Sequence, residues 1–295
     1  MDIVQYLARK KRAIDHMLEQ LVPEESEFPP RLHQAMRYAL LAGGKRLRPI
    51  LALAAAEAVG GNAEAILREA CALEFIHTYS LIHDDLPAMD NDAVRRGMPS
   101  THTVFGEALA ILAGDALLTE AFAILSRRLN NCCNLHATIA IIKLIADAAG
   151  SRGLIGGQVV DLESEGKDID EPLLEYIHTH KTGCLITASI LLGATLAGCT
   201  SEQLNHLRDY GSAIGLAFQI TDDILDVTES TQTLGKPAGS DQKKQKATYP
   251  ARYGIEGARK KQHALYTTAL EALQTFDEKA EPLRHIARYI IERTA

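Results

Sequence analysis

Apolar side chains recur at helical spacing through most of this chain, and this period constrains its fold more than any other feature. Leucine, isoleucine and alanine return at positions i, i+3, i+4 and i+7, which places them on one face of an α-helix. No alternating run is long enough to demand a sheet. Helices are therefore predicted in windows bounded by glycine, proline or polar residues: about 3–18, 32–41, 50–59, 63–85, 106–129, 134–150, 170–197, 201–227, 254–275 and 280–293.

At 295 residues the chain has room for one large or two ordinary domains. We predict an all-α fold with a single domain, residues 1–295, whose long helices pack around a deep central cavity. Hydrophobic residues make up 46% of the sequence, enough for a sizeable core. Because aromatic residues are only 5% and Trp is absent, that core should be aliphatic.

The net charge of −7 argues against a nucleic-acid partner, since nucleic-acid-binding surfaces normally carry a basic excess. The cysteines show neither metal-ligand spacing nor a disulfide framework: Cys71, Cys132, Cys133, Cys184 and Cys199. An odd number of cysteines in a chain this long fits a reducing cytosol, so a cytoplasmic location is predicted.

No membrane span is predicted. The basic residues 9–12 have no apolar segment after them, which indicates an amphipathic helix rather than a signal peptide. The longest run without charge, residues 182–201, has the length of a short membrane span. Its glycines and threonines dilute that run and favour a buried core helix.

A dense acidic cluster interrupts the helical pattern. Residues 80–97 bring together four aspartates and two arginines: Asp84, Asp85, Asp90, Asp92, Arg95 and Arg96. Such a set suits a divalent cation on the carboxylates and a phosphate on the guanidiniums. On a continuous helix, Asp84 and Asp90 would lie about 120° apart. Pro87 disfavours helix there, and we predict that the break returns Asp90 to the side of Asp84.

A second acidic cluster, residues 220–226, echoes the first. Asp222 and Asp226 are at i and i+4, about 6 Å apart on one helix face, while Asp223 points elsewhere. Two carboxylates on one face repel, and Mg²⁺ binds one or two carboxylates together with phosphates and waters. Each cluster precedes a breaker-rich segment, 86–103 or 228–250, and both are predicted to be loops at the mouth of one cavity. Solvated helix ends are the alternative for either cluster alone.

Basic residues stand near these loops and in a glycine-rich segment, residues 43–49. There Lys45 and Arg48 are three apart, on one face if helical, and the glycines let a phosphate approach closely. Further along are Lys181, Lys236 and Lys246. Each alone is more often a surface charge. Their interleaving with the acids indicates a Mg²⁺-bridged diphosphate.

Taken in order, these motifs resemble those of the trans-isoprenyl diphosphate synthases, in particular the bacterial farnesyl diphosphate synthase type. The resemblance implies an all-α bundle, usually a homodimer, that transfers prenyl groups. Isopentenyl diphosphate would condense head-to-tail with dimethylallyl or geranyl diphosphate to give farnesyl diphosphate (C15) and pyrophosphate. It also implies Mg²⁺ as cofactor, with about three ions per active site. The matching segments are Gly43 to Pro49, Ser80 to Asp85 with Asp90, Arg95 to Gly97, Gly156 to Gln158 with Asp161, Lys181-Thr182, Gly215 with Phe218-Gln219, Asp222-Asp223 with Asp226, and Gly235-Lys236.

The resemblance also implies the role of each site residue. Isopentenyl diphosphate would bind to Lys45, Arg48, His77 and Arg96, and the allylic diphosphate would bind to Arg95, Lys181, Lys236 and Lys246. Mg²⁺ would bind to Asp84, Asp90 and Asp222, which are supported by Asp85, Asp223 and Asp226. The residues that act in catalysis at the allylic cation would be Lys181, Thr182 and Gln219. A core histidine is an equal alternative for His77 when the resemblance is set aside.

Product length is predicted from two residues that precede the first acidic cluster. Tyr79 and Ser80 lie five and four residues before Asp84, about 6–7.5 Å further along the helix. We predict that the Tyr79 ring closes the cavity floor and limits the product to C15. Geranyl or geranylgeranyl diphosphate synthesis stays open, because sequence fixes cavity depth poorly. A terpene cyclase would leave the second set of basic residues unexplained, and two intact acidic motifs disfavour a non-catalytic prenyl-lipid binding protein.

Overall fold

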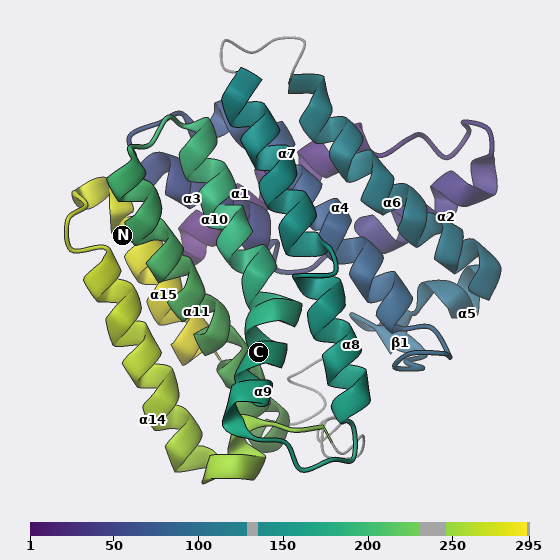
Figure 1. Ribbon diagram of the computed structural model, residues 1–295. Helices are drawn as coiled ribbons and strands as arrows, with labels where there is room; N and C mark the ends of the chain where they lie inside the picture. The colour runs from purple at the N-terminus through teal and green to yellow at the C-terminus, as the bar shows by residue number, and fades with distance from the viewer. Residues whose placement is uncertain (129–134, 230–245, 294–295) are drawn as a thin grey trace. The chain divides into compact units, whose positions relative to one another are not determined.

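The structure is a computed structural model, and it describes residues 1–128, 135–229 and 246–293 (Figure 1). Over these residues the fold is all-α, which confirms the predicted class, and its strands form one short antiparallel hairpin. The elements in chain order are α1 (Ile3–Leu21), α2 (Pro30–Leu40), α3 (Leu47–Ala58), η1 (Ala63–Ile66), α4 (Leu67–Asp84), β1 (Val94–Arg95), β2 (Met98–Pro99), α5 (Thr101–Phe105), α6 (Glu107–Arg127), α7 (Leu135–Ala149), α8 (Leu154–Ser164), α9 (Glu171–Ile177), η3 (His178–Gly183), α10 (Cys184–Leu196), α11 (Ser201–Thr228), α14 (Tyr249–Ala272), η4 (Glu278–Ala280) and α15 (Glu281–Glu292).

The predicted helical windows are confirmed, with corrections at their ends. Helix α3 begins at Leu47, before Pro49 rather than after it, because proline is tolerated in a first turn whose N–H groups lack helical acceptors. Helix α14 begins at Tyr249 rather than 254. Thr248 caps it by accepting a hydrogen bond from the Ala251 N–H at 3.3 Å, and Gly254 (φ 68°) then kinks it.

Two helices were missed, and two of the predicted windows were too simple. The short helix α5 and helix α8 were not predicted; α8 contains two consecutive glycines, which are poor helix formers. The window 170–197 is not one regular helix, because α9 and α10 are joined by the π-helical turn η3. The window 63–85 likewise opens with the 3₁₀ turn η1.

The chain divides into two compact units. The α4 unit comprises Val4–Ile50 and Glu64–Ile142, and the α11 unit comprises Met1–Ile3, Leu51–Ala63 and Lys143–Ala295. Each unit has its own acidic motif. The predicted single domain around a central cavity stays a prediction.

Helix α4 is the buried helix of its unit, where it packs against α6 and α2 (Figure 1). Its side chains are apolar around most of the helix, and Leu73, Phe75 and Ile76 are fully buried. A helix packed on all sides is rigid. The acidic motif at its C-terminal end therefore begins from a fixed position.

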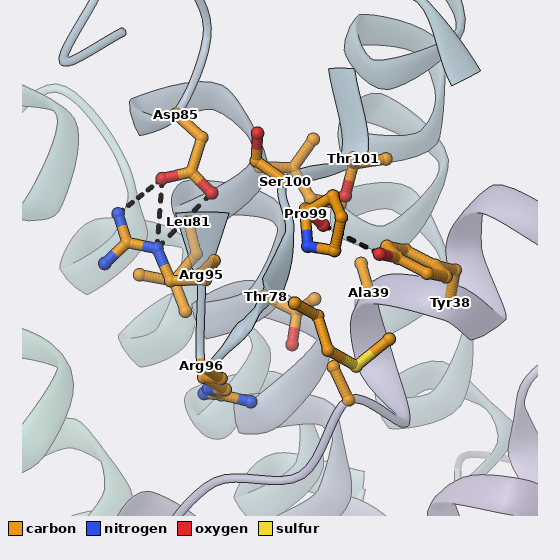
Figure 2. Close-up of a pocket in the computed structure, with 13 residues that line it drawn as sticks. Tyr38, Ala39, Thr78, Leu81, Asp85, Arg95, Arg96, Pro99, Ser100 and Thr101 are labelled. Atoms are coloured by element: carbon orange, nitrogen blue, oxygen red, sulfur yellow. Dashed lines mark hydrogen bonds and ion pairs between the residues drawn. The ribbon is translucent and has the colours of Figure 1, made fainter. Parts of the chain in front are cut away.

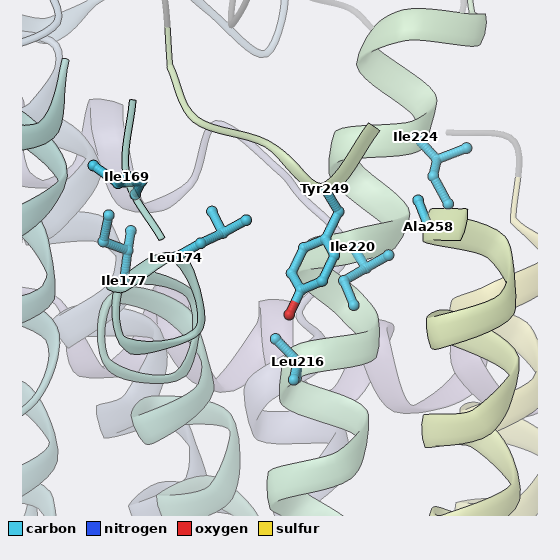
Figure 3. Packing of buried hydrophobic residues seen from close by; sticks show 8 residues of the cluster. All are labelled: Ile169, Leu174, Ile177, Leu216, Ile220, Ile224, Tyr249 and Ala258. Carbon is cyan, nitrogen blue, oxygen red and sulfur yellow. The ribbon is translucent and has the colours of Figure 1, made fainter. Parts of the chain in front are cut away.

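Helix α11 is the corresponding helix of the α11 unit, and it carries the second acidic motif. Thr200 and Gln203 form a capping box at its start, with Thr200 Oγ1 accepting from the Gln203 N–H at 3.1 Å and Gln203 Oε1 accepting from the Thr200 N–H at 2.9 Å. The helix packs against α10, η3 and α14. Figure 3 shows the apolar cluster at its acidic end, formed by Ile169, Leu174, Ile177, Leu216, Ile220, Ile224, Tyr249 and Ala258.

Glycines allow η3 to approach α11 very closely. A Cβ added at Gly215 would lie 2.9 Å from the Gly183 Cα, closer than real Cβ contacts allow. Because neither helix has a side chain at this crossing, the backbone of η3 lies directly against α11. The residues of η3 are thereby set beside the start of the second acidic motif.

Two helices bear on the membrane prediction. Helix α10 is buried along most of its length, so the charge-free run 182–201 contains a core helix as predicted. In the described part of the chain one helix, α6, is long and apolar enough to cross a membrane by length and composition, with 39% of its most apolar window buried. Helices of water-soluble proteins pass the same test, so this is weak evidence for a span.

Candidate active site

The first acidic motif folds back on itself where α4 ends. The Asp90 N–H donates to the Asp84 carbonyl at 2.8 Å, and the Asn91 N–H donates to the Leu86 carbonyl at 3.0 Å. Asn91 has φ 53°, in the left-handed region that asparagine tolerates best after glycine. The predicted return of Asp90 to Asp84 is confirmed for the backbone.

Asp85 holds Arg95. Its carboxylate is buried and accepts from Arg95 Nε at 3.0 and 3.3 Å and from Nη2 (Figure 2). This fork geometry fixes the guanidinium plane. Removal from water raises the pKa of Asp85 above its ordinary value, and the Arg95 hydrogen bonds oppose that shift. In this structure the Asp85 carboxylate therefore orients the Arg95 guanidinium.

Arg96 turns to a different partner from Arg95. It donates from Nη1 to the carbonyl of Gly43, in the glycine-rich segment. Its φ of 56° is unusual for a residue with a side chain. The two consecutive arginines therefore have different partners within the protein, and their assignment to two diphosphates stays a prediction.

The hairpin that carries both arginines is anchored by Tyr38 of α2. The Tyr38 hydroxyl donates to the Pro99 carbonyl at 2.7 Å (Figure 2). The Tyr38 ring also packs edge-on against Phe105. A pocket of about 30 Å³, the space of roughly one water, lies between Tyr38 and the arginines. Sequence reasoning missed Tyr38, because a lone tyrosine in an amphipathic helix gives no signal.

The glycine-rich segment adopts a backbone that needs glycine. Gly43 has φ 86° and Gly44 has φ 122°. A Cβ at Gly44 would lie 2.7 Å from the Arg96 guanidinium. The Arg96 guanidinium therefore packs directly against the backbone of the glycine-rich segment. Near them on α4, removal from water and the charges of Arg48 and Arg96 lower the pKa of His77 well below its ordinary value.

The second acidic motif spreads its carboxylates over different surroundings. Asp222 is about 37% exposed and accepts from Arg293 Nη2 at 2.6 Å, while that guanidinium stacks on the Phe218 ring. Asp223 and Asp226 are buried. The pairing with Arg293 joins residues 71 apart in sequence and had no sequence signal.

A hydrogen-bond chain runs through Asp223. The Thr182 hydroxyl donates to Gln219 Oε1 at 3.0 Å, and Gln219 Nε2 donates to Asp223 Oδ1 at 3.1 Å. Asp223 Oδ2 accepts from the Tyr249 N–H at 3.1 Å and lies 3.1 Å from His178 Nε2. Asp223 therefore fixes Gln219, and Gln219 fixes Thr182. The structure brings this predicted pair together.

Lys181 and Lys246 share one carboxylate. Asp161 of α8 lies 2.7 Å from Lys181 Nζ and 3.7 Å from Lys246 Nζ. Gly157 makes this possible, since a Cβ there would be 2.2 Å from the Lys181 backbone nitrogen. The structure thus brings two predicted diphosphate ligands to one place. The third, Lys236, lies outside the described residues.

Gln158 is the most unusual polar residue in this unit. It is 7% exposed, and over the described residues neither its amide oxygen nor its amide nitrogen has a hydrogen-bond partner. Burying an amide without hydrogen-bond partners is costly. The only sequence signal was its place in the Gly-Gly-Gln motif, to which no role had been assigned.

The donor set of the first motif fits Mg²⁺. Over the described ranges no three histidine, cysteine, aspartate or glutamate side chains gather as a metal-binding group. Asp84 and Asp90, adjacent through the backbone bond, offer two carboxylates. Mg²⁺ takes one or two carboxylates when phosphate and water complete its shell, whereas a structural metal needs a full protein cage.

Comparisons with known proteins agree with the motifs. The Polyprenyl synthetase family model matches residues 29–289. A geranylgeranyl diphosphate synthase of Cyanophora paradoxa is 46% identical over 293 residues, covering 99% of this chain and 97% of that protein. A farnesyl diphosphate synthase of Geobacillus stearothermophilus is 43% identical, covering 99% and 98%. The crystal structure of geranylgeranyl pyrophosphate synthetase from Pyrococcus horikoshii Ot3 superposes with a TM-score of 0.90 at 32% identity, covering 99% of this chain and 100% of that one.

These matches span nearly the whole chain, and they include proteins named for C15 and for C20 products. The basic and acidic groups described above are the chemistry that a diphosphate needs. The chain belongs to the polyprenyl synthetase family and is a trans-prenyl diphosphate synthase, a transferase whose substrates are isoprenoid diphosphates.

Proposed function

We propose that this protein is a farnesyl diphosphate synthase that adds isopentenyl diphosphate to dimethylallyl and then geranyl diphosphate. The observation that carries the C15 product is Tyr79. It lies on α4 five residues before Asp84, is 4% exposed, and packs edge-on against His83. Among the described residues its hydroxyl has no hydrogen-bond partner, and we propose that the ring acts through its bulk.

The proposed mechanism begins with the allylic diphosphate. Arg95, oriented by Asp85, and Lys181 and Lys246, gathered at Asp161, bind its phosphate oxygens, and Lys236 is expected to add a further contact. Asp84, Asp90 and Asp222 would hold Mg²⁺, with about three ions expected. When bound, Mg²⁺ neutralises the charge that develops on the leaving diphosphate.

The second substrate needs its own cationic site. Lys45, Arg48, His77 and Arg96 are proposed to bind isopentenyl diphosphate. Burial, and after it the charges of Arg48 and Arg96, lowers the pKa of His77 and keeps that imidazole neutral. Breaking the allylic C–O bond leaves a carbocation. The alkene of isopentenyl diphosphate attacks it, a C–C bond forms, and the released diphosphate takes up the proton that leaves the new cation. Thr182 and Gln219 are proposed to face the cation with oxygen lone pairs held in place by Asp223.

Asp223 and Asp226 are proposed to support this site. Asp223 is 2% exposed and already accepts from the Gln219 side chain and the Tyr249 N–H. A carboxylate committed in this way orients its neighbours. Asp226, 3% exposed, would support Asp222 one turn before it on the same face.

A cytoplasmic homodimer is proposed as the working form. Apolar side chains of the α4 unit remain exposed on α6 and on the first turns of α7, namely Ile111, Leu112, Leu135 and Ile139. Each is more than 40% exposed, which suits a surface that a second copy covers. The proposal of a homodimer rests on this surface and on the family.

Geranylgeranyl diphosphate synthesis is the competing function, favoured by the 46% identity to a protein of that name. Tyr79→Ala is expected to decide the matter. Removing the ring should lengthen the product, so that the ratio of C20 to C15 rises by about 10- to 200-fold, the range over which pockets discriminate small differences in size. Chromatography of the products formed from geranyl diphosphate measures this ratio.

Tyr79→Phe is the matched control, since it keeps the ring and removes only a hydroxyl without a partner in the described structure. It should still release C15. If the wild-type protein releases mainly C20, or if Tyr79→Ala still stops at C15, Tyr79 does not set the product length.

A further inference from the structure

We propose that Arg46, Asp15 and Glu74 form a positioning unit that fixes the glycine-rich segment and Arg96, and thereby sets the affinity for isopentenyl diphosphate. The inference rests on the proposed function, which assigns that substrate to Lys45, Arg48, His77 and Arg96. None of the three residues touches substrate in this role. They act by holding those that do.

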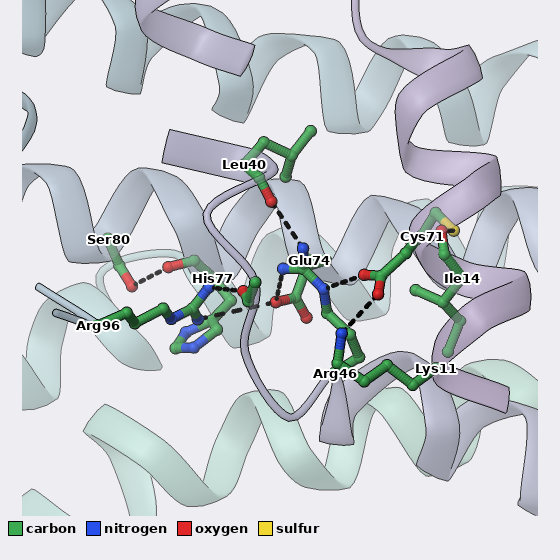
Figure 4. Close-up of polar contacts among 11 residues, drawn as sticks. Lys11, Ile14, Leu40, Arg46, Cys71, Glu74, His77, Ser80 and Arg96 are labelled. Atoms are coloured by element: carbon green, nitrogen blue, oxygen red, sulfur yellow. Dashed lines mark hydrogen bonds and ion pairs between the residues drawn. The ribbon is translucent and has the colours of Figure 1, made fainter. Parts of the chain in front are cut away.

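Arg46 lies at the centre of the unit, and its side chain is 1% exposed. Its Nε donates to Asp15 Oδ1 on α1 at 2.8 Å, and its Nη1 donates to Glu74 Oε1 on α4 at 2.7 Å (Figure 4). Its Nη2 donates to the Leu40 carbonyl, at the end of α2, at 2.8 Å. One side chain therefore ties three helices to the segment that contains it.

This anchoring fixes the neighbours of Arg46. Arg46 has φ 53°, a conformation that a residue with a side chain adopts only when its surroundings enforce it. Lys45 is the preceding residue and Arg48 is two residues later. Since the guanidinium cannot move without breaking three hydrogen bonds, the backbone that directs Lys45 and Arg48 cannot move either.

Glu74 extends the unit to the other proposed ligands. Its Oε1 lies 4.0 Å from Arg96 Nη2, while Arg96 also donates to the Gly43 carbonyl (Figure 4). His77 follows Glu74 by three residues on α4, on the same side of the helix. The glutamate therefore joins the glycine-rich segment to Arg96.

Stability alone does not account for such a device. A buried ion pair contributes little compared with apolar side chains of similar volume, because both charges must leave water. Here Arg46 has an unfavourable φ, and its side chain and that of Glu74 are buried beside residues assigned to a diphosphate. We infer that the desolvation cost of these buried charges is offset in function, because a cationic site whose groups are already in place binds its ligand more tightly.

Glu74→Gln tests the proposal through the two Michaelis constants. We expect the KM for isopentenyl diphosphate to rise at least about tenfold, as for other residues that orient ligands, while the KM for geranyl diphosphate stays within about twofold. Calorimetric titration with isopentenyl diphosphate should show the same loss of affinity. A merely structural role would instead change both KM values, kcat and Tm together.

Glu69→Gln is the matched control. Glu69 lies on the same helix, is also buried, and pairs with Arg128 at 3.2 Å, away from the glycine-rich segment. The identical exchange there should leave both KM values unchanged. Equal effects of the two exchanges, or no change in the isopentenyl diphosphate KM for Glu74→Gln, would overturn the proposal.

Should Glu74→Gln fail to fold, Asp15→Asn decides by the same criteria, because the Asp15 side chain is 36% exposed and its loss costs less. Lys45→Ala, measured in the same assay, separates the two levels of inference. If it raises the KM for isopentenyl diphosphate while Glu74→Gln and Asp15→Asn do not, the positioning role is wrong but the proposed substrate site stands. If it has no effect either, the proposed substrate site itself is wrong.

Discussion

Asp84→Asn is expected to lower kcat by about 100- to 1,000-fold, the scale on which enzymes lose rate when a group stabilising developing charge is removed. The exchange keeps the size of the side chain but removes a negative oxygen ligand of Mg²⁺. The hydrogen bond to Asp90 is made by the Asp84 backbone carbonyl, so the turn itself should survive. The Mg²⁺ concentration for half-maximal activity should rise in the same variant.

Asp115→Asn provides the comparison, because Asp115 is a 61% exposed aspartate on α6 without an assigned role. Its kcat and Mg²⁺ dependence should equal those of the wild type. A fully folded Asp84→Asn protein with a normal Mg²⁺ requirement would show that the first acidic motif does not hold the cation.

Asp223→Ala is expected to destabilise the fold by about 3 kcal/mol and to abolish most of the activity. The carboxylate is 2% exposed and holds the Gln219 side chain, the Tyr249 N–H and the His178 ring. Its removal leaves buried donors without an acceptor, at about 1–3 kcal/mol for each group left unsatisfied. Urea unfolding followed by circular dichroism measures the change in free energy.

Asp209→Ala is the control on the same helix, since Asp209 is exposed. It should change the free energy of unfolding by less than about 0.5 kcal/mol, as surface exchanges do. An Asp223→Ala protein as stable as the control would mean that the chain from Thr182 to His178 contributes nothing to the fold. Loss of activity at unchanged stability would instead give Asp223 a role in the active site that is separate from its contribution to the fold.

The fold class followed from the sequence because helical periodicity is a local property. The same is true of the turn at Asp84, where Pro87 ends the helix and the Asp90 N–H returns to the Asp84 carbonyl. Helix α8 was missed because its glycines, which lower helix propensity, are used for close packing against Lys181. The π-helical turn η3 has no periodic signature, since it adds a single turn within a longer helical window.

The charged residues of the site could be predicted from the sequence, but the protein groups that pair with them could not. Arg46 looked like one more member of a basic run, and only tertiary contacts 28 and 31 residues away reveal it as the buried one. Arg293 and Tyr38 likewise find partners 71 and 61 residues distant. A sequence pattern indicates which side chains can bind a diphosphate. Contacts between residues far apart in the sequence determine which of these side chains instead pair with other residues of the protein.

The most direct measurement is diphosphate release from an allylic substrate, with and without isopentenyl diphosphate and with and without Mg²⁺. We expect release only when both substrates and Mg²⁺ are present, together with a C15 product, and we expect chelation to stop it reversibly. Release from geranyl diphosphate alone, with a cyclised or hydrolysed product, or turnover that persists after chelation, would contradict a Mg²⁺-dependent chain-elongating synthase.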